Sequence, residues 1–284
     1  MTWHKDILEW RADKTVYMSI VFSWQLREAE TRIRNRQFGE DRFVVGGPAV
    51  KFNPDYLSRI AETNGDISNM LQRHNPEATR TSTGCIRKCQ FCAVPKIEGD
   101  LQELGEWPVL PVVCDNNLLA CSRKHFDSVI DNLKRLEWCD FNQGLDARLL
   151  TQYHADRLAE LKNPRIKLAW DHIKDEKYII GAITKLRKAH ISRASISCYV
   201  LIGFNDTPED ALYRLETLFH GLGINPNPMR YQPLTTVQTN EYVGPNWTNK
   251  ELIRYMRYWS NLRYLGGVPF NEFDMPTITG AVNE

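Results

Sequence analysis

Three cysteines lie close together in the stretch TSTGCIRKCQFCAVP (81–95). Cys85, Cys89 and Cys92 follow the spacing C-x3-C-x2-C, which is typical of a metal site rather than of disulfides. A structural zinc ion takes four ligands, and no second C-x2-C or H-x3-H pair lies nearby to complete such a set. Ferredoxin-type clusters also use four thiolates, at other spacings. The pattern therefore predicts a centre with one ligand position left open.

A 4Fe–4S cluster held by three thiolates has this property, because its fourth iron has no cysteine ligand. Catalytic metal sites keep such a position for a substrate. An amino acid with adjacent amino and carboxylate groups can chelate that iron. Two further interpretations stay open, namely a non-catalytic iron–sulfur protein of electron transfer and a zinc-binding interaction module.

The cysteine motif, with Phe91 just before its last cysteine, resembles that of the radical S-adenosylmethionine (radical SAM) superfamily. The resemblance implies that the open iron of a 4Fe–4S cluster binds S-adenosyl-L-methionine (SAM) and that Phe91 lies against the adenine. It implies that one electron cleaves SAM to methionine and a 5′-deoxyadenosyl radical, which takes a hydrogen atom from a substrate. The electron would come from a flavodoxin- or ferredoxin-like reductant.

The sequence around the motif, GCIRKCQFCAVPKIEG, is similar to that of the branch that contains methylthiotransferases and cobalamin-associated radical SAM enzymes. Two features of that branch are missing. No cysteine precedes Cys85, so the auxiliary cluster that inserts sulfur is not expected. The Asp-x-His-x-x-Gly loop that ligates cobalt is also missing, so cobalamin is not expected.

Polar residues follow the predicted strands, and the resemblance gives them roles. Relatives often end the second strand in Gly-Gly-Glu, which holds the SAM amino group. Here Asp115, Asn116 and Asn117 occupy that place. Asp115 can accept a hydrogen bond from an ammonium as the glutamate would. Asn117 serves equally well as a turn residue.

Three further strand ends complete the predicted SAM site. Asp171 follows the fourth strand, where a carboxylate can accept from ribose hydroxyls or simply begin a helix. The fifth strand ends in LIGF, where Ile202 would pack on the adenine and Gly203 would let the backbone approach it. The third strand is followed by residues that could line the site or form a surface ion pair: Gln143, Asp146 and Arg148. From the sixth strand, Met229, Arg230 and Tyr231 are candidates to face the substrate.

The other cysteines match no cluster motif and are predicted to be small core residues: Cys114, Cys121, Cys139 and Cys198.

The sequence segments that must position these residues are of two alternating kinds. Short apolar runs predict strands, and the segments between them have the apolar periodicity of helices. Such alternation predicts a parallel sheet, and six β–α units predict an α/β fold with a partial (β/α)6 TIM-like barrel over residues 76–265. In such folds the site lies at the carboxyl ends of the strands. The predicted strands are 78–83, 108–114, 138–144, 166–170, 194–204 and 229–234. Helix N-caps are predicted at Thr151, Thr207 and Thr248.

Residues 1–75 are predicted to form a small α/β domain that resembles a shortened cobalamin-binding domain. Its expected strands are 16–22 and 43–50, and its expected helices are 24–37 and one that starts at Asn53. Residues 266–284 are predicted to be a C-terminal tail.

The composition is that of an ordinary globular chain, with 42% hydrophobic and 25% charged residues in 284. The net charge of +1 gives no general basic excess, so an RNA substrate would need a local patch. The substrate stays an unknown organic molecule, with a nucleic-acid base as one candidate. No apolar run is long enough for a membrane span, and the first residues lack the apolar segment of a signal peptide. We therefore expect a cytoplasmic protein.

Overall fold

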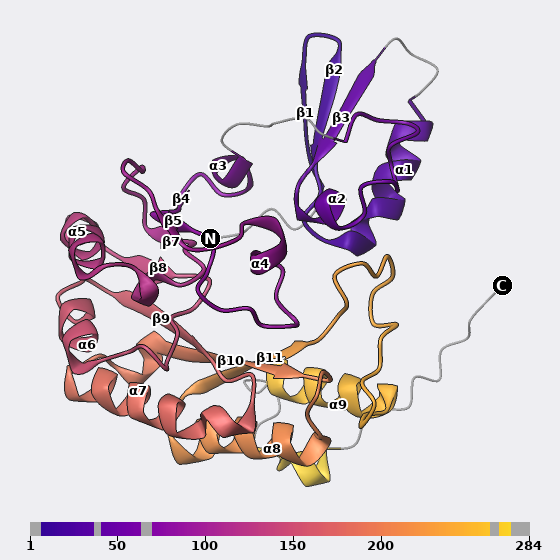
Figure 1. Cartoon of the computed structure of the whole chain (residues 1–284). Helices are drawn as coiled ribbons and strands as arrows, with labels where there is room; N and C mark the ends of the chain where they lie inside the picture. The colour runs from indigo at the N-terminus through magenta and orange to yellow at the C-terminus, as the bar shows by residue number, and fades with distance from the viewer. Residues whose placement is uncertain (1–6, 37–40, 64–69, 262–266, 274–284) are drawn as a thin grey trace.

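The computed structural model describes residues 7–36, 41–63, 70–261 and 267–273. A small N-terminal α/β unit and a larger unit built on a six-stranded sheet are seen in Figure 1. Each has its own buried hydrophobic cluster, the first running from Ile7 to Leu57 and the second from Val113 to Phe270. In the sequence, the short helix α3 (Met70–His74) lies between the two units.

The N-terminal unit is a three-stranded sheet covered by helix α1 (Leu26–Arg34). Its strands are β1 (Leu8–Ala12), β2 (Thr15–Ser19) and β3 (Arg42–Gly46), with β1 antiparallel and β3 parallel to β2. β3 ends at Gly46, four residues before the predicted end at Val50. The strand stops there because Gly47 has a φ of +100° and Pro48 then begins α2 (Pro48–Phe52). The helix predicted to start at Asn53 is wrong, since the described residues after Phe52 form turns.

The large sheet is parallel throughout, as the β–α alternation predicted. Its strand order follows the chain without a break, and it does not close on itself. The strands are β4 (Ala78–Thr79), β7 (Val112–Val113), β8 (Cys139–Phe141), β9 (Pro164–Ala169), β10 (Ile196–Ile202) and β11 (Asn225–Arg230). The sixth strand therefore begins four residues earlier than predicted and ends at Arg230. Pro226 and Pro228 are tolerated there because β11 is an edge strand.

Helices connect successive strands and cover one face of this sheet (Figure 1). Right-handed crossovers between sequential parallel strands place all connecting helices on the same side. Side-chain caps at Thr151, Thr207 and Thr248 begin three of the helices, as predicted. The connecting helices are α5 (Arg123–Leu133), α6 (Gln152–Leu158), α7 (Glu176–Lys188) and α8 (Pro208–Glu216), and α9 (Asn249–Ser260) follows the last strand.

The chain after α9 is more than a tail in its described part. Phe270 is buried against Tyr255 and Tyr258 of α9, with ring centroids 4.7 and 5.1 Å apart. Residues 274–284 lie outside the described residues. Across the described residues, no helix combines the length and the apolar character needed to cross a membrane.

Candidate metal centre and adjoining cavity

The three clustered cysteines lie on a loop that joins β5 (Ser82–Thr83) to helix α4 (Val94–Ile97). β5 pairs with β6 (Gln102–Glu103), so the loop and α4 form an excursion between β4 and β7 of the large sheet. Gly84 starts the loop with a φ of +70°, and a Cβ on it would lie 2.0 Å from the Asp100 carbonyl oxygen. Only glycine therefore fits at this position.

The base of the loop is also tied by hydrogen bonds. The Cys85 amide donates to the Gly99 carbonyl at 3.2 Å, and the Gly84 amide donates to Glu98 Oε2 at 3.0 Å. Glu98 also receives hydrogen bonds from Arg80 and Asn116, at 2.7 and 2.6 Å. These three donors outweigh burial and hold the pKa of Glu98 below its usual range. Sequence analysis missed Glu98, whose role depends on partners far from it in sequence.

The three loop thiols are half-buried. N–H groups that could stabilise a thiolate donate to Cys85. Cys85 Sγ accepts from the Arg87 amide at 3.3 Å and from Asn117 Nδ2 at 3.6 Å. The Cys92 amide donates to the Cys89 carbonyl at 3.1 Å, which closes a tight turn between the last two cysteines. Burial raises the pKa of Cys89 and of Cys92, so both thiols favour the protonated form without a metal. Ligation requires deprotonation, which a bound metal would drive.

The three sulfurs are not gathered around one point. Within the described ranges, no three His, Cys, Asp or Glu side chains are close enough together to hold a single metal ion. Each thiolate of an iron–sulfur cluster binds a different iron, so cluster ligands stand further apart than the ligands of one ion. Three accessible thiols and N–H donors beside a sulfur are compatible with such a group.

The remaining cysteines belong to the core. Cys114, Cys139 and Cys198 are buried, and Cys121 packs against the main cluster. Burial raises the pKa of Cys114 and Cys139 to about 12 and that of Cys121 to about 11. As predicted, these thiols are structural rather than reactive.

A polar network lies beside Cys85. Asn117 Nδ2 also donates to Asp146 Oδ2 at 3.3 Å, and Asp146 accepts from Arg87 at 3.1 Å and from Arg148 at 2.7 Å. Burial opposes ionisation of Asp146, but the two guanidinium groups outweigh it and hold its pKa below the usual range. Asn117 Oδ1 is buried and has no hydrogen-bond partner among the described residues. A buried orphan acceptor of this kind is suited to a ligand donor.

A cavity of about 280 Å³ opens next to the loop. It joins Cys89 and Phe91 to Arg148 and to residues at the carboxyl ends of β9 and β10. The structure thus brings Asp171 and Phe91, two of the residues predicted to contact SAM, to one cavity. Other lining residues include His172, Ile173, Asp175, Leu201, Phe204, Asp206 and Asp210.

The electrostatics of this cavity are dominated by carboxylates. Asp171, Asp175, Asp206 and Asp210 line it, together with one guanidinium, that of Arg148. Burial raises the pKa of Asp171 to about 6, although Arg214 and Arg148 oppose the shift. An electronegative, partly buried cavity favours a positively charged ligand.

A fully buried arginine holds the carboxyl ends of β9 and β10 together. Arg214 of α8 donates to the Trp170 carbonyl at 2.8 Å and the Leu201 carbonyl at 3.0 Å, and it pairs with Asp206. Burial raises the pKa of Asp206 and Arg214 opposes it. The Arg214–Asp206 ion pair therefore stabilises the strand ends that line the cavity, and sequence analysis did not find this pair.

Four predicted SAM-contact residues do not line the cavity, namely Asp115, Asn117, Ile202 and Gly203. Ile202 is fully buried in the main core, because alternation along β10 turns Leu201, and not Ile202, to the cavity. Gly203 has a φ of +80°, and a Cβ on it would lie 2.8 Å from Leu252 of α9. Its role in this structure is to let the chain turn and α9 pack closely.

Asp115 also differs from its prediction. It is 3% exposed, and both of its carboxylate oxygens accept from Thr81, one from the amide at 2.6 Å and one from the hydroxyl. It therefore joins the segment before the cysteine loop to the end of β7. The carboxylate has its partners within the protein, whereas Asn117 keeps an acceptor free.

None of the three candidates of the sixth strand lines the cavity, but Tyr231 contacts the lining residue Phe204. The Phe91 and Phe204 rings meet edge to face with their centroids 5.7 Å apart, and the Phe204 and Tyr231 ring centroids are 4.6 Å apart. Arg230 donates to the Asn240 and Tyr242 carbonyls at 2.8 Å and so holds the loop after β11. Met229 lies opposite Leu201 in the parallel pairing of β10 and β11, and it is 50% exposed.

Comparison with known proteins gave no family for this chain. No protein-family model matches it, and no curated protein is similar enough to count as a match.

Proposed function

We propose that this chain is a radical SAM enzyme that acts on an organic substrate. The observation that carries the proposal is that the C-x3-C-x2-C loop borders an acid-lined cavity at the carboxyl ends of two parallel strands. Cys85, Cys89 and Cys92 would hold a 4Fe–4S cluster. When bound, the cluster supplies an electron that cleaves SAM to methionine and a 5′-deoxyadenosyl radical. The sequential parallel strands with helices on one face suit a TIM-like partial barrel as the scaffold.

The side chains of the cavity have chemistry that suits SAM. SAM carries a positive sulfonium and a positive ammonium, which the carboxylates of the cavity favour. Asp171 would accept from the ribose hydroxyls, and Phe91 and Leu201 would contact the adenine. We assign the ammonium to Asn117, which lies beside Cys85 and not in the cavity lining, rather than to Asp115. Asn117 Oδ1 is a buried acceptor without a partner among the described residues, whereas both oxygens of Asp115 accept from Thr81. Arg148 would bind the carboxylate of SAM.

The enclosing residues would also control access. Phe91, Phe204 and Tyr231 form an aromatic rim that would keep water from the reacting atoms. A flavodoxin- or ferredoxin-like donor in the cytoplasm would provide the electron. The substrate, for which a nucleic-acid base remains a candidate, would reach the site across the sheet face opposite the helices.

Two alternatives remain distinct from this proposal. A non-catalytic iron–sulfur protein would load the cluster without binding SAM. A zinc-binding module would hold zinc on the same cysteines. The ligand-sized cavity beside Cys89 favours the enzyme, because neither alternative needs one.

Anaerobic reconstitution with iron and sulfide tests the assignment. The wild-type chain should bind iron and sulfide in equal amounts and change its absorption spectrum when SAM is added. A triple Cys→Ala variant at positions 85, 89 and 92 should lose both, whereas Cys121→Ala, which removes a thiol outside the loop, should lose neither. A triple variant that keeps its full iron content would refute the assignment, and colourless wild-type protein with stoichiometric zinc would favour the zinc module.

A further inference from the structure

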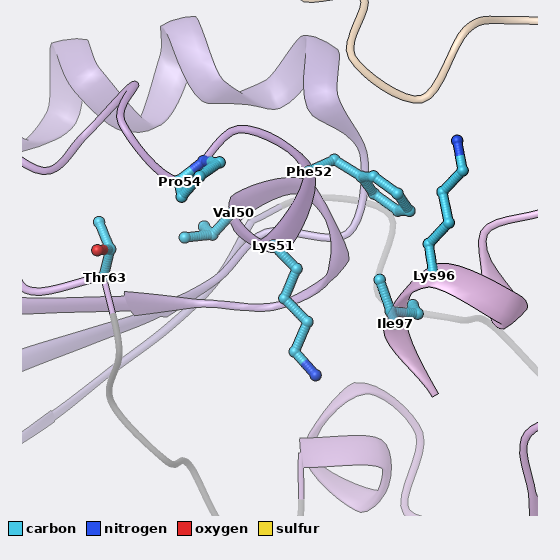
Figure 2. A pocket seen from close by; sticks show the side chains of 7 residues that line it. All are labelled: Val50, Lys51, Phe52, Pro54, Thr63, Lys96 and Ile97. Atoms are coloured by element: carbon cyan, nitrogen blue, oxygen red, sulfur yellow. The ribbon is translucent and has the colours of Figure 1, made fainter. Parts of the chain in front are cut away.

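A second and larger cavity lies where the N-terminal unit meets the cysteine-loop helix. Its volume is about 480 Å³, and α2 and the turn after it face α4 across it (Figure 2). Val50, Pro54 and Ile97 give it apolar walls. Phe52 extends its ring from α2 toward α4 (Figure 2). The proposed function uses none of these residues.

The polar groups of this cavity are two lysines and a threonine, Thr63. Lys51 comes from α2 and Lys96 from α4, and Figure 2 shows their side chains extending in opposite directions. Both lysines are exposed, and neither forms an ion pair with a carboxylate in the described part of the chain. Among the described residues, no acidic side chain lines the cavity. Each rim therefore carries one cationic group.

The two cavities have opposite charge. The one beside Cys89 is lined by four aspartates and one arginine, whereas the described residues that line this one include two lysines and no acid. An anion would be repelled from the first and attracted to the second. An aromatic ring beside cationic groups is the combination with which proteins bind nucleotides, the ring stacking on a base and the cations contacting phosphate.

We propose that the cavity between α2 and α4 binds a nucleotide, with the base on Phe52 and phosphate at the lysine rims. The nucleotide comes either from a free nucleotide or from a single-stranded nucleic acid, whose successive phosphates would reach both rims. α4 begins two residues after Cys92, so the ligand contacts the same segment that ends the cysteine loop. The proposal does not depend on iron, SAM or the proposed reaction.

Isothermal titration of the anaerobically purified full chain tests this site. The probes are 2′-deoxythymidine 5′-phosphate, the uncharged nucleoside, inorganic phosphate and a short oligothymidylate. The nucleotide should bind more tightly than the nucleoside or phosphate alone. Lys51→Gln and Lys96→Gln should each weaken binding about tenfold or more. Phe52→Leu should weaken binding without changing its salt dependence.

Matched controls separate this site from the other cavity. Lys188→Gln removes an exposed lysine of α7 and should leave the affinity unchanged, as should Asp171→Asn in the acidic cavity. If nucleic acid is the source, the oligothymidylate should bind more tightly than the mononucleotide. Its logarithmic salt slope should then fall by about 0.7 for each lysine removed. Equal affinity for both probes would identify a free nucleotide.

Two results would overturn the proposal. One is folded wild-type chain that binds neither the mononucleotide nor the oligothymidylate. The other is a Lys51→Gln/Lys96→Gln double variant that binds them as tightly as wild type. Either result would leave the cluster and SAM assignments untouched, because those rest on the other cavity.

Discussion

Replacing Asp171 by asparagine should make the protein more stable and less able to bind SAM. Burial raises the pKa of Asp171 to about 6, against about 3.9 for an unfolded aspartate. Between these values the folded protein retains a proton that the unfolded chain has released. Stability from this group is therefore fully present below about pH 4 and is lost as the pH rises toward about 6.

The size of the effect follows from the shift. About two pKa units at about 1.4 kcal/mol each correspond to about 3 kcal/mol of unfolding free energy. The amide of Asp171→Asn does not ionise, so the variant should keep that stability at neutral pH. The expected gain over wild type is up to about 3 kcal/mol above pH 6, and it should vanish near pH 4.

Urea unfolding followed by tryptophan fluorescence, at several pH values from 4 to 7.5, measures this difference. The urea dependence m should stay the same, so that the midpoint reports stability. Asp55→Asn, which removes an exposed carboxylate of the N-terminal unit, is the control and should show no such gain. SAM affinity of Asp171→Asn should fall. A variant whose stability changes with pH as steeply as wild type would refute the reasoning about this cavity.

Three further predictions concern the framework around the site. Arg214→Met should cost about 3–5 kcal/mol in urea unfolding, because it leaves Asp206 without its buried partner; a loss under 1 kcal/mol would contradict the role of this pair. Gly84→Ala should lower iron loading, because its Cβ would meet the Asp100 carbonyl, and wild-type loading would show that the loop base can rearrange. Ile202→Ala should cost about 2–5 kcal/mol, whereas Leu201→Ala should mainly weaken SAM binding; the reverse pattern would mean that the phase of β10 is wrong.

Local signals in the sequence predicted the elements that depend on neighbouring residues. Thr151, Thr207 and Thr248 cap helices because the cap uses an amide within the next turn. The parallel strand order likewise follows from the β–α alternation. The edge strand β11 was misplaced, because Pro226 and Pro228 hide a strand signal that only its edge position permits.

The site was harder to predict, because its geometry depends on distant partners. Asp115 is at a strand end, but Thr81 of another segment satisfies both its oxygens. Ile202 and Leu201 differ only in the phase of alternation, which the sequence of a strand does not determine when both residues are apolar. Arg214 joins two strand ends through a helix residue whose partners are not encoded by any local pattern.

Reductive cleavage of SAM is the most direct test of the central claim. The reconstituted chain, mixed with SAM and dithionite without oxygen, should produce 5′-deoxyadenosine, slowly even without a substrate. Cys121→Ala should do the same, and the triple variant at Cys85, Cys89 and Cys92 should produce none. A fully loaded wild-type protein that binds SAM and yields no 5′-deoxyadenosine with several reductants and candidate substrates would contradict the assignment as a radical SAM enzyme.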